Sequence, residues 1–281
     1  MAAVGVLHPG DMGGVVGACA KAAGQRVLWA SAGRSAGTRE RAAAAGLEDA
    51  GTVAALLAAS DVVLSICPPH AAVDLAREVA AQRFDGLYVD GNAVAPATAR
   101  EVGAIVERGG AAFVDGGLIG PPPRSAGTTR LYLSGREAKR VVALFEGSAL
   151  EAISVSDAPG AASALKMVYA AVTKGTSALL MAVRALAATE GVDDALLAEW
   201  RRSQPDLPKR SEAAARDNAR KAWRFVGEME EIAATFETAG LPGGFHQAAA
   251  EIYRRLAGYK DVAAPPAMAD LVEPLTRQRR P

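Results

Sequence analysis

The feature that most constrains the fold is a regular alternation of short apolar segments with helix-like segments through the first 158 residues. The apolar segments are rich in Val, Leu and Ile, which is typical of strands buried on both faces of a parallel sheet. Residues 1–158 are therefore predicted to form a doubly wound α/β domain. The strands that we expect are Val4–Leu7, Arg26–Trp29, Val62–Ile66, Gly86–Asp90, Ala112–Asp115, Arg130–Leu133 and Ala152–Val155.

A long Ala-rich run over residues 159–191 follows, and it has the signals of a single helix. Asp157 and Pro159 are suited to its start and Gly191 to its end. At about 1.5 Å per residue the run would be about 50 Å long, too long for a crossover inside one domain. Its seam of apolar positions, spaced three and four residues apart, is Leu165, Tyr169, Val172, Thr176, Leu179, Val183 and Leu186. We expect the 159–190 helix to pair with a second copy of the chain in a homodimer.

The remainder of the chain has no convincing strand pattern. Helices are predicted over Asp193–Ser203, over Arg210–Glu237 with possible breaks, and over Gly244–Leu256. Residues 159–262 are thus expected to form an all-helical domain for substrate binding and dimerisation. Residues 263–281 are rich in Pro and Arg, which predicts a flexible tail.

The composition of the chain indicates which kinds of binding partner and which cellular location to expect. The 281 residues carry 31 Lys and Arg against 31 Asp and Glu, and this balance argues against nucleic acid or an anionic membrane as the main partner. Two distant cysteines and no visible secretory leader favour a reducing, cytoplasmic location. No Cys, His or acidic residues have metal-ligand spacing, so no metal site is expected.

The turn after the first strand has part of a dinucleotide-binding fingerprint. It reads His8-Pro9-Gly10-Asp11-Met12-Gly13, with His8 in the place of the first glycine and with Gly10 and Gly13 in the second and third places. We predict cofactor binding by His8, Pro9, Gly10, Met12 and Gly13 in a Rossmann-type domain. An ordinary β–α turn is the alternative that these residues alone leave open.

The end of the second strand indicates which nucleotide would bind. NAD-binding proteins usually place an acidic residue there, but the first acid after this strand is Glu40. Arg34, Ser31 and Ser35 instead supply a guanidinium and hydroxyls suited to a 2′-phosphate. The sequence therefore predicts NADP, although Arg34 could also be a solvated loop residue.

Taken together, these motifs resemble the β-hydroxyacid dehydrogenase family, which includes 3-hydroxyisobutyrate and 6-phosphogluconate dehydrogenases, and the related imine reductases. The opening turn is similar to the family's GLGxMG, and Gly33-Arg34-Ser35 is similar to its NADP-binding element. The segment ending in Cys67-Pro68 resembles a strand and turn beside the cofactor. Asp90-Gly91-Asn92 resembles the segment that would place Asn92 near the nicotinamide and the substrate.

The resemblance also implies a substrate site. The segment 115–121 stands where the family has a substrate loop, which implicates Ile119 and Gly120. Lys166 matches the family lysine that assists proton transfer, and Tyr169, one turn on, could donate a second hydrogen bond unless it only packs. Thr173 and His246 are further candidates for contact with substrate.

The departures from the family pattern limit what can be transferred. Tyr169 and Ala170 replace the family asparagines, Ile119 replaces a serine, and Thr173 replaces a glutamate. We therefore expect an NADP(H)-dependent oxidoreductase that transfers a hydride between nicotinamide and a small hydroxy-acid or carbonyl compound, with Lys166 as general acid/base. The alternatives are an imine reductase on the same fold and a non-catalytic NADP-binding sensor or scaffold.

Overall fold

The computed structural model describes residues 1–277, and the chain divides into two compact units. The first ends at Met167 and the second begins at Val168. The division falls inside the long helix α7 (Ala161–Thr189), whereas the predicted boundary lies between residues 158 and 159. The difference arises because the first turns of α7 pack on the sheet of the first unit, as described below.

The first unit contains an eight-stranded sheet in the order β3-β2-β1-β4-β5-β6-β7-β8. All neighbouring strands are parallel except β6 and β7, which are antiparallel. The predicted α/β class is confirmed, as a mixed and mostly parallel sheet. The strands are β1 Ala3–Val6, β2 Arg26–Trp29, β3 Glu48–Asp49, β4 Val62–Ser65, β5 Leu87–Asp90, β6 Ala112–Ile119, β7 Arg130–Ser134 and β8 Glu151–Ser156.

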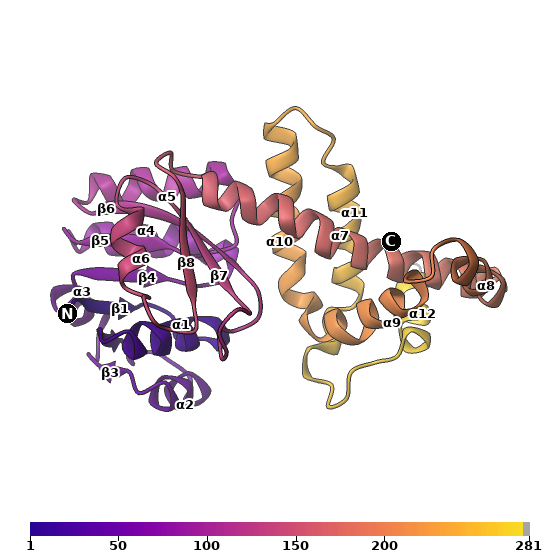
Figure 1. The fold of residues 1–281 in the computed structure, drawn as a ribbon, viewed down its shortest axis with the longest axis horizontal. Helices are drawn as coiled ribbons and strands as arrows, with labels where there is room; N and C mark the ends of the chain where they lie inside the picture. Colours follow the sequence, from indigo (N-terminus) through magenta and orange to yellow (C-terminus); the bar gives the residue numbers. More distant parts are fainter. Residues whose placement is uncertain (278–281) are drawn as a thin grey trace. The chain divides into compact units, whose positions relative to one another are not determined.

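Helices cover both faces of this sheet (Figure 1). Apolar residues of α1, α2 and α6 pack with one face, and those of α3, α4 and α5 pack with the other. Val4 and Val6 of β1 belong to the first core, whereas Ala3 of the same strand packs against the second, as expected for a strand that is covered on both faces. The helices are α1 Asp11–Ala22, α2 Ala36–Ala44, α3 Val53–Ala58, α4 Ala72–Ala81, α5 Pro96–Arg108 and α6 Ala138–Ala143, with a short 3-10 turn at Pro69–Ala71.

The described part of the second unit is helical. After α7 come α8 Asp193–Ser203, α9 Leu207–Asn218, α10 Ala222–Thr238, α11 Gly244–Arg255 and α12 Met268–Thr276, with 3-10 turns at Ala219–Lys221 and Ala257–Asp261. The first of these turns is the break within the predicted Arg210–Glu237 helix. Among the residues that the structure describes, no helix is both long and apolar enough to cross a bilayer.

Helix α12 differs from the flexible tail that we predicted for residues 263–281. Met268, Leu271 and Leu275 lie on one face of this helix and are buried, so this part of the segment is packed. Residues 278–281 of the predicted tail lie outside the described part of the chain.

One buried and one partly buried cation connect α7 to the helices of its own unit. Arg184 forms ion pairs with Asp193 and Glu212 and donates a hydrogen bond to Ser211, and it is only 7% exposed. Lys174 forms an ion pair with Glu228 of α10. Removing one partner of such an ion pair would leave an uncompensated charge inside the protein, which is destabilising. We therefore expect these contacts to fix the register of α7 against its neighbouring helices.

The apolar seam predicted along α7 is only partly buried within the single chain. The buried side of the helix consists mainly of alanines and methionines, for example Ala178 and Met181. Tyr169, Val172, Leu179 and Leu186 of the predicted seam are 47–67% exposed. The second unit therefore presents a row of large apolar side chains to its surroundings.

Candidate functional site

The carboxyl ends of the parallel strands place most of the predicted cofactor residues at one edge of the sheet. The chain leaves β1 toward β2 and β3 on one side, and it returns to β4 on the other side. Such a reversal opens a crevice between the ends of the two central strands, here β1 and β4. His8 follows β1 and Cys67 follows β4, so these two residues flank the reversal point.

The glycine-containing turn after β1 requires glycine for two different reasons. A Cβ on Gly13 would overlap the backbone oxygen of His8, so the third glycine of the motif permits close packing of α1 on the turn. A Cβ on Gly10 would meet no atom within 4 Å, so this position faces open space. Gly10 caps α1 without any side-chain hydrogen bond, which leaves the first backbone N–H groups of the helix suited to an anion.

Three arginines bond to the backbone after β1 and β2, and two of them, Arg34 and Arg41, bond to the turn after β1. Arg34 Nη2 donates to Leu7 O at 3.1 Å, and Arg39 Nη2 donates to Ser31 O at 2.9 Å. Arg41 Nε donates to Pro9 O at 3.5 Å. Of these three residues, the sequence motifs predict only Arg34 as a cofactor residue. The close spacing of the three residues at the start of α2 was the signal that could have revealed the other two.

Two buried polar atoms in this region have no partner in the structure: Nε of Arg34 and Nδ1 of His8. Burial, reinforced by the positive charge of Arg34, lowers the pKa of His8 to about 4. His8 is therefore neutral at physiological pH, and it adds no positive charge beside Arg34. The guanidinium of Arg34 and the open space at Gly10 both belong to the region of the β1–α1 turn, so the site residues are compatible with a dinucleotide phosphate.

Asn92 is held inside the protein rather than presented freely. Its Oδ1 accepts from Cys67 N at 2.6 Å and its Nδ2 donates to Ser65 Oγ at 3.0 Å, which links the ends of β4 and β5. Its backbone N donates to Asp90 Oδ1. These bonds use one of the two Nδ2 hydrogens and one of the two Oδ1 lone pairs, and they fix the orientation of the amide.

The thiol of Cys67 lies in the same buried polar cluster. Burial, together with the negative charge of Asp90, raises the pKa of Cys67 to about 12. A thiol with so high a pKa stays protonated, so Cys67 is unsuited to act as a nucleophile. Pro68, next in the chain, is exposed at the sheet edge.

The side chain of Lys166 is held by the last part of β6. Its Nζ donates a hydrogen bond to Leu118 O, near the carboxyl end of the strand. Ile119 is buried and offers no polar group, and Gly120 has φ of +129°, which its turn requires. Because β1, β4, β5 and β6 run parallel, Lys166 is held at the same edge of the sheet as the glycine turn.

The remaining predicted residues belong to the second unit. Tyr169 and Thr173 are exposed on α7, where Thr173 Oγ1 donates to Tyr169 O at 3.2 Å. His246 is buried between the rings of Phe236 and Phe245, and burial lowers its pKa. The imidazole of His246 thus packs as a neutral aromatic ring in α11, with Nδ1 unpartnered.

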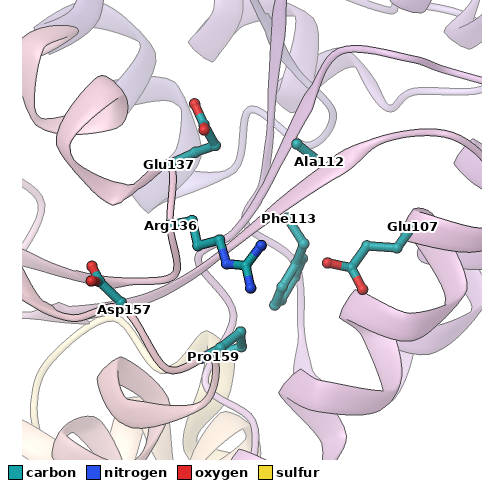
Figure 2. A pocket seen from close by; sticks show the side chains of 7 residues that line it. All are labelled: Glu107, Ala112, Phe113, Arg136, Glu137, Asp157 and Pro159. Carbon is teal, nitrogen blue, oxygen red and sulfur yellow. The ribbon is translucent and has the colours of Figure 1, made fainter.

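A surface hollow of about 450 Å³ lies elsewhere on the first unit. Figure 2 shows the Arg136 side chain pointing toward the ring of Phe113 with carboxylates around it. The hollow includes Ala112, which begins β6, so it lies toward the opposite edge of the sheet from Lys166. None of the predicted site residues lines it; the lining residues are Glu107, Ala112, Phe113, Arg136, Glu137, Asp157 and Pro159. Over residues 1–277 no cluster of His, Cys, Asp or Glu could hold a metal ion.

Comparison with protein families and curated proteins leads to uncharacterised relatives. Residues 187–256 match a family model described as a domain of unknown function, DUF1932. An uncharacterised 28.5 kDa protein from Methanothermus fervidus is 28% identical over 205 residues, which cover 71% of this chain and 78% of that protein. These matches carry no assigned activity.

Solved structures identify the fold. A conserved hypothetical protein from Sinorhizobium meliloti is 26% identical, with a TM-score of 0.69 over 98% of this chain and 96% of that one. The 3-hydroxyisobutyrate dehydrogenase of Mycobacterium tuberculosis is 21% identical, with a TM-score of 0.72 over 99% of this chain and 100% of that one. The chain has the fold of the 3-hydroxyacid dehydrogenases. An imine reductase from Bacillus cereus shares this fold at 19% identity, with a TM-score of 0.57 over 96% of this chain and 98% of that one.

Proposed function

We propose that the protein is an NADP(H)-dependent oxidoreductase that transfers a hydride between nicotinamide and a small carbonyl or hydroxy-acid compound. The observation that carries this proposal is the placement of Lys166 by Leu118, at the sheet edge that also carries the glycine turn. An ammonium at that edge can serve the oxygen of a substrate whose carbon faces a bound nicotinamide.

The residues around the glycine turn would hold the cofactor. The open space at Gly10 and the first N–H groups of α1 would receive the pyrophosphate. Arg34, supported by the hydroxyls of Ser31 and Ser35, would bind a 2′-phosphate, with Arg39 and Arg41 adding positive charge. When bound, NADPH supplies the hydride for reduction of an electrophilic carbon.

Lys166 would supply the proton that accompanies reduction. As the carbonyl carbon gains a hydride, its oxygen develops negative charge, and the Lys166 ammonium donates one proton to that oxygen to give the alcohol. The neutral amine is then protonated again by solvent. In the reverse direction the neutral amine accepts the hydroxyl proton while the carbon loses its hydride.

An imine reductase is a second candidate, because the same proton transfer can serve the nitrogen of a C=N bond. The buried, apolar Ile119 favours it, since this position offers no hydrogen bond to the carboxylate of a hydroxy acid. A non-catalytic NADP-binding protein would keep the arginine cluster and leave Lys166 without a substrate.

We further propose that the chain forms a homodimer through α7. The exposed Val172, Leu179 and Leu186 form an apolar row that a second copy of the helix could cover. Nucleic acid and membrane play no part in this proposal, since the charge of the chain is balanced.

Binding of NADPH and NADH by the wild type and by Arg34→Ala tests the cofactor. Loss of a charge-assisted contact worth about 1.5–3 kcal/mol should weaken NADPH binding by about 10- to 150-fold and leave NADH binding unchanged. Arg77→Ala, which removes a surface ion pair with Asp74, is the matched control and should bind NADPH as the wild type does. Equal NADPH affinity in Arg34→Ala and the wild type would refute the assignment.

Oxidation of NADPH in the presence of keto acids, aldehydes or cyclic imines tests the reaction and separates the candidates. Lys166→Ala should lower kcat for the accepted substrate by about 100-fold or more, the size of a general-acid contribution. NADPH binding without turnover of any of these compounds would favour the sensor. Turnover by Lys166→Ala within a few-fold of the wild type would contradict the role of the lysine.

A further inference from the structure

The buried carboxylate of Asp115 connects the sheet to the first turn of α7. Asp115 is fully buried at the point where β6 leaves its parallel pairing with β5 and begins its antiparallel pairing with β7. Its Oδ1 accepts from Ser163 Oγ at 2.6 Å, and its Oδ2 accepts from Ser163 N and Ser134 Oγ, each at 2.9 Å. Three donors thus converge on one carboxylate inside the protein.

The Asp115 carboxylate also provides hydrogen-bond partners, directly and through Ser134, for backbone N–H groups at the start of α7. Ser134 Oγ, which donates to Asp115, accepts in turn from Ala162 N at 3.1 Å. Two of the N–H groups that a helix leaves unpaired in its first turn are therefore bonded to the sheet through Asp115 and Ser134. A negative charge at the positive end of a helix adds to this anchoring. The network fixes the rotation of α7 about its axis, since it holds both the backbone and the side chain of Ser163.

Gly117, two residues after Asp115, sets the distance between strand and helix. A Cβ at this position would lie 2.7 Å from Ala162 O and 3.1 Å from the Cβ of Lys166. The strand backbone can pack against this part of α7 only because position 117 has no side chain. Lys166 follows Ser163 by three residues and lies on the same side of the helix, where its Nζ reaches Leu118 O.

We propose that Asp115, Ser163 and Gly117 are positioning residues for Lys166, and that they set the angle and the distance at which the ammonium meets the end of β6. This inference rests on the proposed function, in which Lys166 moves the substrate proton. Successive residues of β6 contact successive turns of α7, so an error in the rotation of the helix would displace the lysine from Leu118. A general acid displaced in this way loses catalysis while cofactor binding at the glycine turn is unaffected.

The test compares the full-length wild type with Ser163→Ala and Asp115→Asn. Competitive acetylation with trace acetic anhydride, followed by mass spectrometry, measures the reactivity of each lysine without any turnover. In both variants the labelling rate of Lys166 should rise by about threefold or more, because the amine leaves a partly buried site at Leu118. Exposed Lys139 of the same unit serves as the internal reference.

Ser60→Ala is the control, because it also removes a serine hydroxyl that donates a hydrogen bond, here from a partly buried position to Leu56 O. It should leave Lys166 labelling unchanged. With an accepted substrate, Ser163→Ala should lower kcat by about tenfold and leave the KM for NADPH unchanged. Ser163→Ala keeps the Ser163 N and Ser134 bonds to Asp115, so it provides the test even where Asp115→Asn does not fold.

Unchanged labelling of Lys166 in folded Ser163→Ala would overturn the proposal, and so would equal loss of kcat in Ser60→Ala. Failure of the proposed function has a different signature. In that case the wild type would neither bind nor oxidise NADPH, while the labelling comparison would still report whether the network places the lysine.

Discussion

Asp90 is the residue whose protonation the fold disturbs in the physiological range. It is fully buried on β5, its Oδ2 has no hydrogen-bond partner, and burial raises its pKa to about 7, with Asp115 on the next strand adding to the rise. The backbone N–H of Asn92 and the Asn92 side chain oppose this rise. At neutral pH the side chain is thus close to half protonated, although it belongs to a residue type that is normally charged.

Because the pKa of Asp90 is raised, the effect of Asp90→Asn on stability should depend on pH. Between pH 4 and 7 folded Asp90 binds a proton that the unfolded chain releases, so its contribution to stability is lost as pH rises. Asn lacks this dependence. The free energy of unfolding of Asp90→Asn, relative to the wild type, should therefore increase by about 2–3 kcal/mol from pH 5 to pH 8, because each pKa unit corresponds to about 1.4 kcal/mol.

Urea unfolding at the two pH values measures this difference. The protonation of His8, which makes stability rise with pH between about 4 and 6.5, occurs in both proteins and cancels in the comparison. Asp85→Asn, at an exposed aspartate of the same unit, is the control and should follow the wild type. A pH-independent difference between Asp90→Asn and the wild type would show that Asp90 is ionised throughout.

The limits of sequence-based prediction at the residue scale are visible at two positions. Lys166 was identified from its motif, but its hydrogen bond to Leu118 depends on a strand 48 residues earlier. Asn92 was expected to face the cofactor, yet the two amide hydrogen bonds that hold it bridge two strands. Which partners a side chain takes depends on tertiary packing, which no local pattern contains.

Among the elements, the turn from β1 into α1 offers the sharpest contrast between two glycines. Gly13→Ala should lower the free energy of unfolding by about 1–3 kcal/mol, because its Cβ would meet a backbone oxygen that cannot move aside. Gly10→Ala should leave stability nearly unchanged, since the space around it is open and its φ is −74°. The added methyl group of Gly10→Ala should nonetheless reduce NADPH affinity, because it would fill the space proposed for the pyrophosphate.

Denaturant unfolding and NADPH titration of both variants check this pair. Each variant serves as the control for the other, since one should lose stability and the other affinity. Equal stability of Gly13→Ala and the wild type would mean that α1 does not need its close approach to the turn. Wild-type NADPH affinity in Gly10→Ala would place the cofactor elsewhere.

Element prediction succeeded where apolar runs were continuous and failed where special residues interrupted them. The central strands β1, β4 and β5 were located by their branched apolar residues. The second half of β6, residues 116–119, was not predicted because Gly116 and Gly117 are poor strand formers. Gly117 is nevertheless needed there, because any side chain at this position would clash with α7. Helix α12 was missed because prolines surround it, while Met268, Leu271 and Leu275 already had helical spacing.

For the whole molecule, the exposed apolar row of α7 is the feature that a single chain leaves unexplained. Val172, Leu179 and Leu186 are 47–67% exposed on a helix whose other side is buried in its own unit. The sequence could not separate these two sides, because α7 is apolar almost all round. The structure distinguishes them and directs the dimer proposal to the exposed side.

A charge placed in this row tests the dimer directly. Val172→Asp and Leu179→Asp should each shift the protein toward monomer in size-exclusion chromatography with light scattering, because a buried, unpaired carboxylate opposes association. The wild-type melting temperature should rise with protein concentration, since association stabilises the folded state by mass action, and this dependence should weaken in the variants. Leu241→Asp, at an equally exposed leucine between α10 and α11, should remain dimeric. A wild type that is monomeric at every concentration tested would refute the proposal, and a dimer that tolerates both α7 substitutions would place the interface on another surface.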